Sequence, residues 1–186
     1  ANMLTGATPV ANGGTGLTSG TTNQFLKFTG STTLASAADN DSGKILQVKS
    51  GASIGGNNAS SNTSFTSTST TFNITPTKAS SKIFVSYVIP TNTAQANTSC
   101  KTRIYRQINS GGFSNISNNT TMNNVYINGA SNSSQLSTLQ WLDTPTYSLT
   151  DVLHYMVYFA SSDGGTVNIY NEFGNGNHLT LMEIAT

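Results

Sequence analysis

Charge is scarce in this sequence. Of its 186 residues, eight are lysine or arginine and seven are aspartate or glutamate, which gives a formal net charge of +1 at pH 7. The eight basic residues are scattered along the chain rather than gathered in one segment. Because affinity for nucleic acids and anionic membranes depends on clustered positive charge, we expect no nucleic-acid partner.

Long apolar runs are absent as well. No segment approaches the roughly 20 apolar residues that a membrane-spanning helix requires, so membrane insertion is not expected. The chain opens without the basic and hydrophobic start of a signal peptide. Its first residue is Ala1 rather than methionine, and we therefore expect a processed chain or a piece of a longer one.

The sequence contains one cysteine, Cys100, which excludes an internal disulfide. Its spacing from Thr102 and Ile104 predicts an inward position on a strand, where a free cysteine behaves as a small apolar residue. His154 and His178 form no pair with metal-ligand spacing. The segment 39–43, DNDSG, resembles the start of a calcium loop but lacks the later glutamate, so we interpret it as a turn. We predict neither a metal nor a cofactor.

Small polar residues take the place of charge. Asparagine, serine, threonine and glycine together number 93, which is half of the chain. Seven tyrosines, eight phenylalanines and many threonine, isoleucine and valine residues argue against disorder. The composition is typical of a β protein.

The last third of the chain organises the predicted fold. Three β-rich runs, Leu153–Ala160, Thr166–Glu172 and His178–Ala185, are separated by two turns rich in glycine, aspartate and asparagine. Short β-rich runs with such turns indicate an antiparallel meander. We therefore expect the end of the chain to lie in the middle of a sheet.

The closing strand also bears on assembly. Side chains alternate along a strand, so its apolar residues fall on both faces. One face packs in the domain's own core, and the other needs a second sheet or, as we favour, another subunit. The candidate interface residues are Leu179, Leu181, Met182 and Ile184.

Glu183 shares a face with the leucines of that strand, and a buried carboxylate requires a partner. Arg106 interrupts an otherwise inward series of strand residues, so we predict an ion pair between Arg106 and Glu183. The alternative is that Glu183 ends in solvent at a frayed chain terminus.

The sequence divides into two regions. Residues 1–43 are expected to form a stalk or connector with a small hairpin between Gln24–Phe28 and Thr32–Ala35, and residues 44–186 a head domain. We predict an all-β fold, a jelly-roll-like antiparallel β-sandwich of eight to ten strands without a helix. Pro90 is expected to end a strand that is buried on both faces. The further predicted strands are Lys44–Lys49, Ser64–Ile74, Lys82–Ile89, Lys101–Asn109, Val125–Asn128 and Gln135–Leu142.

Residues 8–16, TPVANGGTG, resemble a glycine-rich element of bacteriophage tail fibres, and the following QFLKFTGSTTLASA resembles the phrase that usually accompanies it. The segments GKILQV, ITPTKASSKIFVSY, WLDTPTY and LTLMEIA are similar to the C-terminal head of marine phage fibres. This resemblance implies a homotrimer in the virion. It also implies an N-terminal side that joins other virion tail proteins, and a tip that binds sugars or proteins of the host surface.

The composition suits binding to a neutral glycan. Aromatic rings stack on the C–H surfaces of sugars, while asparagine, serine, threonine and aspartate side chains bond to hydroxyl groups. In the alternative reading, Trp141 packs in the core and the asparagine-rich loops are merely solvated. The candidate receptor contacts are Tyr126, Asn128, Asn132, Trp141, Asp143 and Tyr147.

The function we predict is that of a non-enzymatic, receptor-binding tail fibre. A structural fibre that decorates the capsid or tail is one alternative, and a polysaccharide-degrading tailspike is another. A glycosidase needs two carboxylates at a fixed separation, and the nearest such pair, Asp143 and Asp151, is better explained by turn formation. A C1q- or TNF-like module is a further possibility at the level of fold alone.

Overall fold

The computed structural model describes residues 17, 20–31, 33–38, 41–52, 56–118, 121–126, 133–169 and 178–186. These residues form strands, turns and loops only, and none of them belongs to a helix that could cross a membrane. The chain divides into two compact units, residues 1–41 and residues 42–186. The boundary predicted from the sequence lies at residue 43.

The first unit contains an antiparallel hairpin. Its strands are β1 (Phe25–Phe28) and β2 (Leu34–Ala37), and Phe25 pairs with Ala37. Phe25 and Phe28 are 63% and 64% exposed, so the hairpin covers little of its own apolar surface. A two-stranded hairpin is marginally stable in water on its own.

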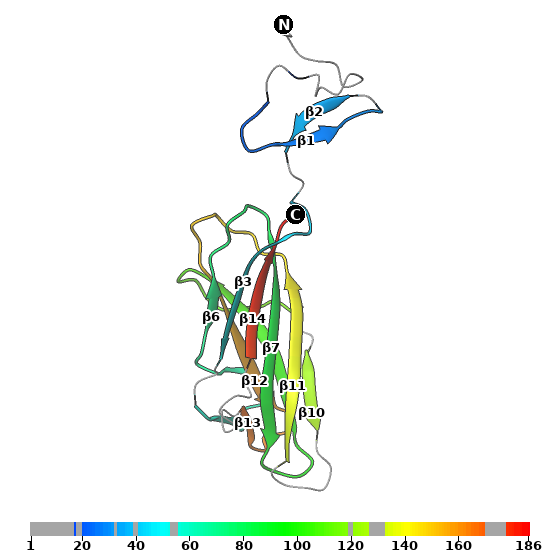
Figure 1. Ribbon diagram of the computed structural model, residues 1–186. Helices are drawn as coiled ribbons and strands as arrows, with labels where there is room; N and C mark the ends of the chain where they lie inside the picture. Colours follow the sequence, from blue (N-terminus) through cyan, green and yellow to red (C-terminus); the bar gives the residue numbers. More distant parts are fainter. Residues whose placement is uncertain are drawn as a thin grey trace, which may run out of the picture. The chain divides into compact units, whose positions relative to one another are not determined.

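The second unit is a sandwich of two antiparallel sheets (Figure 1). The first sheet contains β3 (Ile45–Ala52), β4 (Asn58–Ser60), β7 (Lys82–Thr93), β11 (Ser133–Asp143), β13 (Val167–Ile169) and β14 (His178–Ile184). The second sheet contains β5 (Thr66–Ser67), β6 (Phe72–Ile74), β8 (Ser99–Ile108), β9 (Ser114–Asn115), β10 (Asn123–Tyr126) and β12 (Leu153–Ser161).

The strand order is that of a jelly roll. On one side, the first part of β7 pairs with β14 and its last part pairs with β13. β14 pairs in turn with β3, and β13 pairs with β4. The first sheet is therefore four positions wide, with the order β3/β4, β14/β13, β7 and β11. The second sheet has the order β9/β10, β8, β12 and β5/β6. Eight positions in two such sheets make a jelly roll, and this confirms the predicted fold class.

The predicted meander at the end of the chain is wrong. β12 pairs with β8 in the second sheet, whereas β13 and β14 both pair with β7 in the first sheet. The turn at 162–165 therefore carries the chain across the sandwich instead of closing a hairpin. Local turn chemistry is the same in both cases, so the sequence pattern did not distinguish them. The expected central position of the closing strand is confirmed, since β14 lies between β3 and β7.

Pro90 does not end its strand. β7 continues to Thr93, and Pro90 lies between Val88, which pairs with β14, and Thr91, which pairs with β13. A residue without an N–H group is tolerated there because the ladder on that side changes from one partner strand to another. The prediction of burial on both faces also fails, because every second residue from Lys82 to Val88 is only half-buried.

The core lies between the inner faces of the two sheets. Cys100 is fully buried there as predicted, and burial raises the pKa of its thiol to about 12. The other fully buried side chains that make up most of the core are Ile74, Ile83, Val85, Tyr87, Ile89, Ile104, Leu153, Tyr155, Val157, Val167, Ile169 and Leu181.

The crossing between the sheets depends on a glycine. A Cβ at Gly165 would overlap the side chain of Thr98, which is itself buried and β-branched. We expect Gly165→Ala to lower the free energy of unfolding by roughly 1–3 kcal/mol, as overpacking does, measured by urea denaturation. Gly112→Ala is the matched control, because no atom lies within 4 Å of its added Cβ. Equal stability of the two variants would contradict this account.

Candidate binding surfaces

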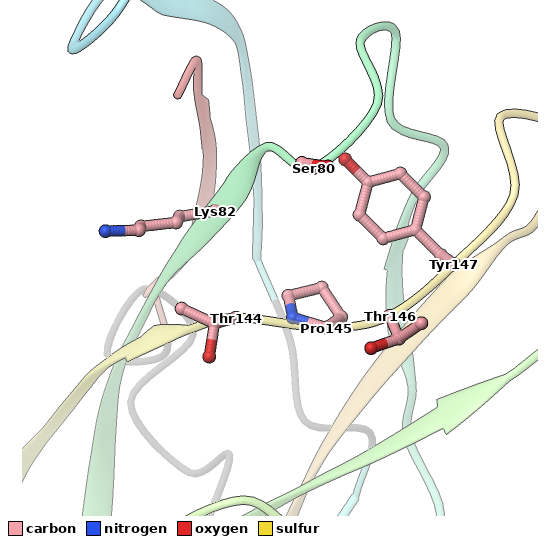
Figure 2. A pocket seen from close by; sticks show the side chains of 6 residues that line it. All are labelled: Ser80, Lys82, Thr144, Pro145, Thr146 and Tyr147. Carbon is pink, nitrogen blue, oxygen red and sulfur yellow. The ribbon is translucent and has the colours of Figure 1, made fainter.

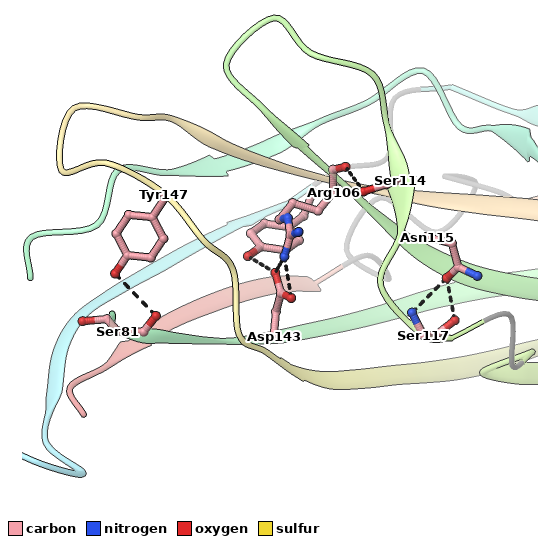
Figure 3. A network of polar contacts seen from close by, with 8 residues as sticks. Ser81, Arg106, Ser114, Asn115, Ser117, Asp143 and Tyr147 are labelled. Atoms are coloured by element: carbon pink, nitrogen blue, oxygen red, sulfur yellow. Dashed lines mark hydrogen bonds and ion pairs between the residues drawn. The ribbon is translucent and has the colours of Figure 1, made fainter. Parts of the chain in front are cut away.

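The structure corrects the predicted ion pair. Arg106 pairs with Asp143 rather than with Glu183: its Nη1 lies 2.7 Å from both carboxylate oxygens of Asp143 (Figure 3). Tyr155 donates a further hydrogen bond to Asp143 Oδ2 at 2.8 Å. Asp143 is buried, so it holds the sandwich together and is not the exposed receptor contact predicted from the sequence.

The packing of the two sheets explains the change of partner. Glu183 and Asp143 both pair with Ile83, from opposite sides of β7, so both carboxylates face inward in one row. β8, which carries Arg106, packs against β7 and β11, whereas β14 packs against β6. Arg106 therefore faces Asp143. The ion pair joins the two sheets, because Asp143 belongs to the first and Arg106 and Tyr155 to the second.

Glu183 is satisfied by neutral groups. Its carboxylate accepts hydrogen bonds from the backbone N–H groups of Thr77 and Lys78, from the Thr77 hydroxyl and from Gln47 Nε2, at 2.7–3.0 Å. Burial raises the pKa of Glu183, but these hydrogen bonds outweigh it and hold the pKa below its ordinary value. Glu183 thus anchors the connection between β6 and β7 to the end of β14.

The predicted receptor contacts do not form one site. Tyr126 is 55% exposed at the end of β10, and its hydroxyl donates to Asn97 Oδ1 at 3.3 Å. Trp141 lies half-buried against the core. Tyr147 follows β11 and lies at the opposite end of the sandwich from Tyr126. β7 runs between these two ends, and its 12 residues span roughly 35 Å. Asn128 and Asn132 lie outside the described residues.

A shallow hollow of about 220 Å³ lies at the Tyr147 end (Figure 2). Tyr147 is fixed there, because its hydroxyl donates to the carbonyl oxygen of Lys78 at 2.6 Å. Lys82 is the one charged residue that lines the hollow. The lining residues are Ser80, Lys82, Thr144, Pro145, Thr146 and Tyr147.

The predicted interface residues divide between two faces. Leu179 and Leu181 are buried in the protein's own core, so they are unavailable to another subunit and that part of the prediction is wrong. Met182 and Ile184 point to the outer face and are half-buried. Alternation along β14 separates the two pairs.

Met182 belongs to an apolar row across the first sheet. In register it pairs with Val48 of β3 and Phe84 of β7, and Phe84 pairs with Leu142 of β11. Val48 is 55% exposed and Leu142 is 47% exposed. We call Val48, Met182, Phe84 and Leu142 the apolar row. Next to it, Ile184 pairs with Ile45, which is 56% exposed.

The outer face of the second sheet carries an aromatic group that the sequence analysis missed. The rings of Tyr105 and Tyr158 stack with centroids 3.9 Å apart, and Phe113 lies 6.0 Å from Tyr158. The Arg103 guanidinium carbon lies 4.1 Å from the centre of the Phe65 ring. We call these five residues the aromatic face. The outward alternation of Arg103 and Tyr105 on β8 was a signal for it in the sequence, whereas the contributions of Phe65 and Phe113 required the fold.

Candidate metal ligands do not gather among the described residues, where no group of three or more histidine, cysteine, aspartate or glutamate side chains occurs. The segment 39–43 lies partly outside the described range.

No family model matches this chain, and no curated protein matches it. Two solved structures of infectious bursal disease virus are similar to it, one of the Gt strain and one of the VP2 subviral particle. Sequence identities are 13% and 15%, and TM-scores are 0.40 and 0.38. The alignments cover 86% of this chain but 42% and 41% of those chains, so this chain spans less than half of their length. At these values the similarity carries no argument about function.

Removing one partner of the ion pair tests its role. We expect Asp143→Asn to lower the free energy of unfolding by about 3 kcal/mol, because Arg106 would keep a largely buried charge without a counter-ion. In the matched double variant, Arg106→Leu with Asp143→Leu, the free energy of unfolding should fall by less than the sum of the decreases in the two single variants. Urea denaturation measures both, and an Asp143→Asn variant within about 0.5 kcal/mol of wild type would contradict the assigned role.

The Glu183 site predicts a dependence on pH. In Glu183→Gln an amide N–H₂ group or a neutral oxygen meets the two backbone N–H donors. We therefore expect the free energy of unfolding to fall by about 2 kcal/mol at pH 7. Since the pKa of Glu183 lies below its ordinary value in the folded protein, its contribution is complete above that value and is lost as pH falls through the folded pKa. The stability difference between wild type and variant should therefore shrink from pH 7 to pH 3. A constant difference would show that the charge is unimportant.

Proposed function

We propose that this protein is a virion appendage, the head-bearing part of an attachment fibre, which binds the host surface without catalysing a reaction. The observation that carries the proposal is the apolar row on the outer face of the first sheet. Because the chain has only 15 charged residues, electrostatic repulsion between copies would do little to prevent this apolar face from associating.

The apolar row and Ile184 form the contact between copies in this proposal. Ile184 follows Met182 on the outer side of β14, so Ile184 and its partner Ile45 extend the apolar row on the β3 side, while Lys82 of β7 pairs with Ile184 on the other side. The resemblance to tail fibres supports three copies as the stoichiometry. In such a fibre the first unit lies on the virion side, where it joins other tail proteins.

Host binding would then rest on avidity. Three identical heads on one rigid assembly raise the effective concentration of each weak site for the same surface, and no single site needs high affinity. The exposed Tyr126 and the small polar residues of the loops are suited to a glycan or protein receptor.

The tailspike alternative depends on a pair of carboxylates, and the pair considered from the sequence is engaged elsewhere. Asp143 is bound by Arg106 and Tyr155. Asp151 accepts hydrogen bonds from the backbone N–H of Ser148 and the side chain of Asn109, which hold its pKa below the ordinary value. These contacts favour the non-enzymatic proposal over this particular catalytic pair.

A combined measurement of mass and attachment tests the proposal. We expect the purified chain to be a trimer by light scattering and to bind host cells. A trimer that binds no candidate host would favour a structural fibre, and loss of polysaccharide viscosity on incubation would favour a tailspike. A monomer would overturn the role assigned to the apolar row.

A charge in the apolar row should prevent assembly. We expect Met182→Asp to convert the trimer to a folded monomer, because association would bury three carboxylates without partners. Sedimentation measures the mass, and denaturation confirms that the variant is folded. Ser50→Asp is the control: Ser50 is an exposed residue of β3 in the neighbouring polar row and should leave the trimer intact. A trimeric Met182→Asp variant would move the interface elsewhere.

A further inference from the structure

Thr77, Gln47 and Glu183 form a cluster of a hydroxyl, an amide and a carboxylate. We propose that Thr77 and Gln47 form a covalent ester bond, for which Glu183 acts as the base. Three segments supply the groups: Gln47 lies on β3, Glu183 lies near the end of β14, and Thr77 belongs to the connection between β6 and β7. A threonine hydroxyl becomes a nucleophile when an adjacent base takes its proton. The bond is a modification that the protein makes with its own residues.

Both reacting groups contact the same oxygen atom. The Thr77 hydroxyl donates a hydrogen bond to Glu183 Oε2 at 2.9 Å, and Gln47 Nε2 donates one to that oxygen at 2.7 Å. Gln47 Nε2 also donates to the carbonyl oxygen of Thr75 at 2.7 Å. Since both of its partners are acceptors, the amide nitrogen rather than the amide oxygen faces Glu183. The nucleophile and the leaving group therefore lie next to one basic atom.

The backbone holds the threonine beside the base. The N–H groups of Thr77 and Lys78 both donate to the Glu183 carboxylate, at 2.9–3.0 Å. Such positioning removes much of the entropy cost of bringing reacting groups together. Glu183 is fully buried, and its pKa lies below the ordinary value. The carboxylate is therefore ionised at pH 7 and able to accept a proton.

The reaction needs no other reagent. Glu183 Oε2 takes the hydroxyl proton of Thr77 while Thr77 Oγ1 bonds to Cδ of Gln47. The bond between Cδ and Nε2 then breaks, and Nε2 leaves as ammonia with its own two protons and the one from Glu183. Glu183 is ionised again at the end, and it keeps the hydrogen bonds from the backbone N–H groups of Thr77 and Lys78. One ester bond replaces one side-chain amide.

The ester bond ties the first strand of the second unit to the connection between β6 and β7. The second unit begins at residue 42, and β3 lies at one end of the strand order of its sheet, next to β14. A pull on the chain from the first unit therefore reaches β3 before the other strands of the sandwich. Such a bond suits the proposed attachment fibre but does not depend on that function, because it forms within a single chain.

Mass spectrometry of the purified, denatured full chain tests the inference. We expect a mass lower than that of the sequence by one ammonia. Trypsin cleaves after Lys44, Lys49 and Lys78, so the two reacting residues fall in separate peptides, 45–49 and 50–78. These peptides should be recovered joined to each other. Alkaline hydroxylamine, which cleaves esters, should separate them.

Variants separate the roles of the three residues. Thr77→Val lacks the hydroxyl and should have its full sequence mass, whereas Thr77→Ser should still lose ammonia. Thr75→Val is the matched control, because it removes a neighbouring hydroxyl but keeps the carbonyl oxygen that binds Gln47, and it should be linked as the wild type is. Glu183→Gln should slow formation of the bond by about a hundredfold, measured as the linked fraction over time. Urea denaturation confirms that each variant is folded.

Three results would overturn the inference. The first is a wild-type chain with its full sequence mass. The second is a lower mass with peptides 45–49 and 50–78 recovered separately and unmodified, which would show that ammonia is lost elsewhere. The third is a joined pair of peptides in Thr77→Val, which would show another nucleophile. Because these masses are measured without a host cell, they leave the proposed function untouched, and a failure of attachment leaves the ester bond untouched.

Discussion

The inward row that contains Glu183, Ile83 and Asp143 constrains the whole sandwich. It places two of the chain's seven carboxylates between the sheets, where an unpartnered charge is very costly. Each is satisfied differently, Asp143 by Arg106 and Tyr155, and Glu183 by Gln47 and the backbone of residues 77 and 78. The first set fixes the second sheet over β11, and the second fixes the connection from β6 to β7. Both sets match the facing order of the strands, in which β8 packs against β7 and β11 and β14 packs against β6.

That order determines what each outer face can do. The inner alternation of β14 uses Leu179 and Leu181 for the core, which leaves Met182 and Ile184 outside. The inner alternation of β8 uses Cys100, Thr102 and Ile104, which leaves Arg103 and Tyr105 outside. The apolar row and the aromatic face therefore lie on opposite sides of the sandwich.

Much of the fold was predictable from the sequence because strands have a period of two. The alternation in Lys101–Asn109 indicated its buried side, and the density of short strands indicated the jelly roll. In the closing strand both faces are apolar, so alternation alone did not decide which of them enters the core. Pairing was less predictable. The turn at 162–165 has the residues of a hairpin turn but crosses between the sheets. The prediction that Pro90 ends its strand was wrong because the β7 residues on either side of it pair with two successive strands, β14 and β13.

The sites were harder to predict for the same physical reason. Two carboxylates, those of Asp143 and Glu183, face inward and were candidate partners of Arg106. Which of them Arg106 binds depends on which strands face each other across the sandwich. Asp143 looked like a loop residue because it precedes Thr144 and Pro145, although it is the last inward residue of β11. The pairing of Phe65 with Arg103 joins segments that are almost 40 positions apart, and no local pattern encodes such a contact.

The composition gains a physical meaning from the row beside the apolar one. There Thr180 pairs with Ser50 and Ser86, and Ser86 pairs with Gln140, so the outer face continues with hydroxyl and amide groups instead of charges. Neutral polar groups cost less to remove from water than charged ones, so a row of this kind can lie beside an apolar surface without a large desolvation cost. The abundance of serine, threonine and asparagine thus keeps this part of the outer face polar with few charges.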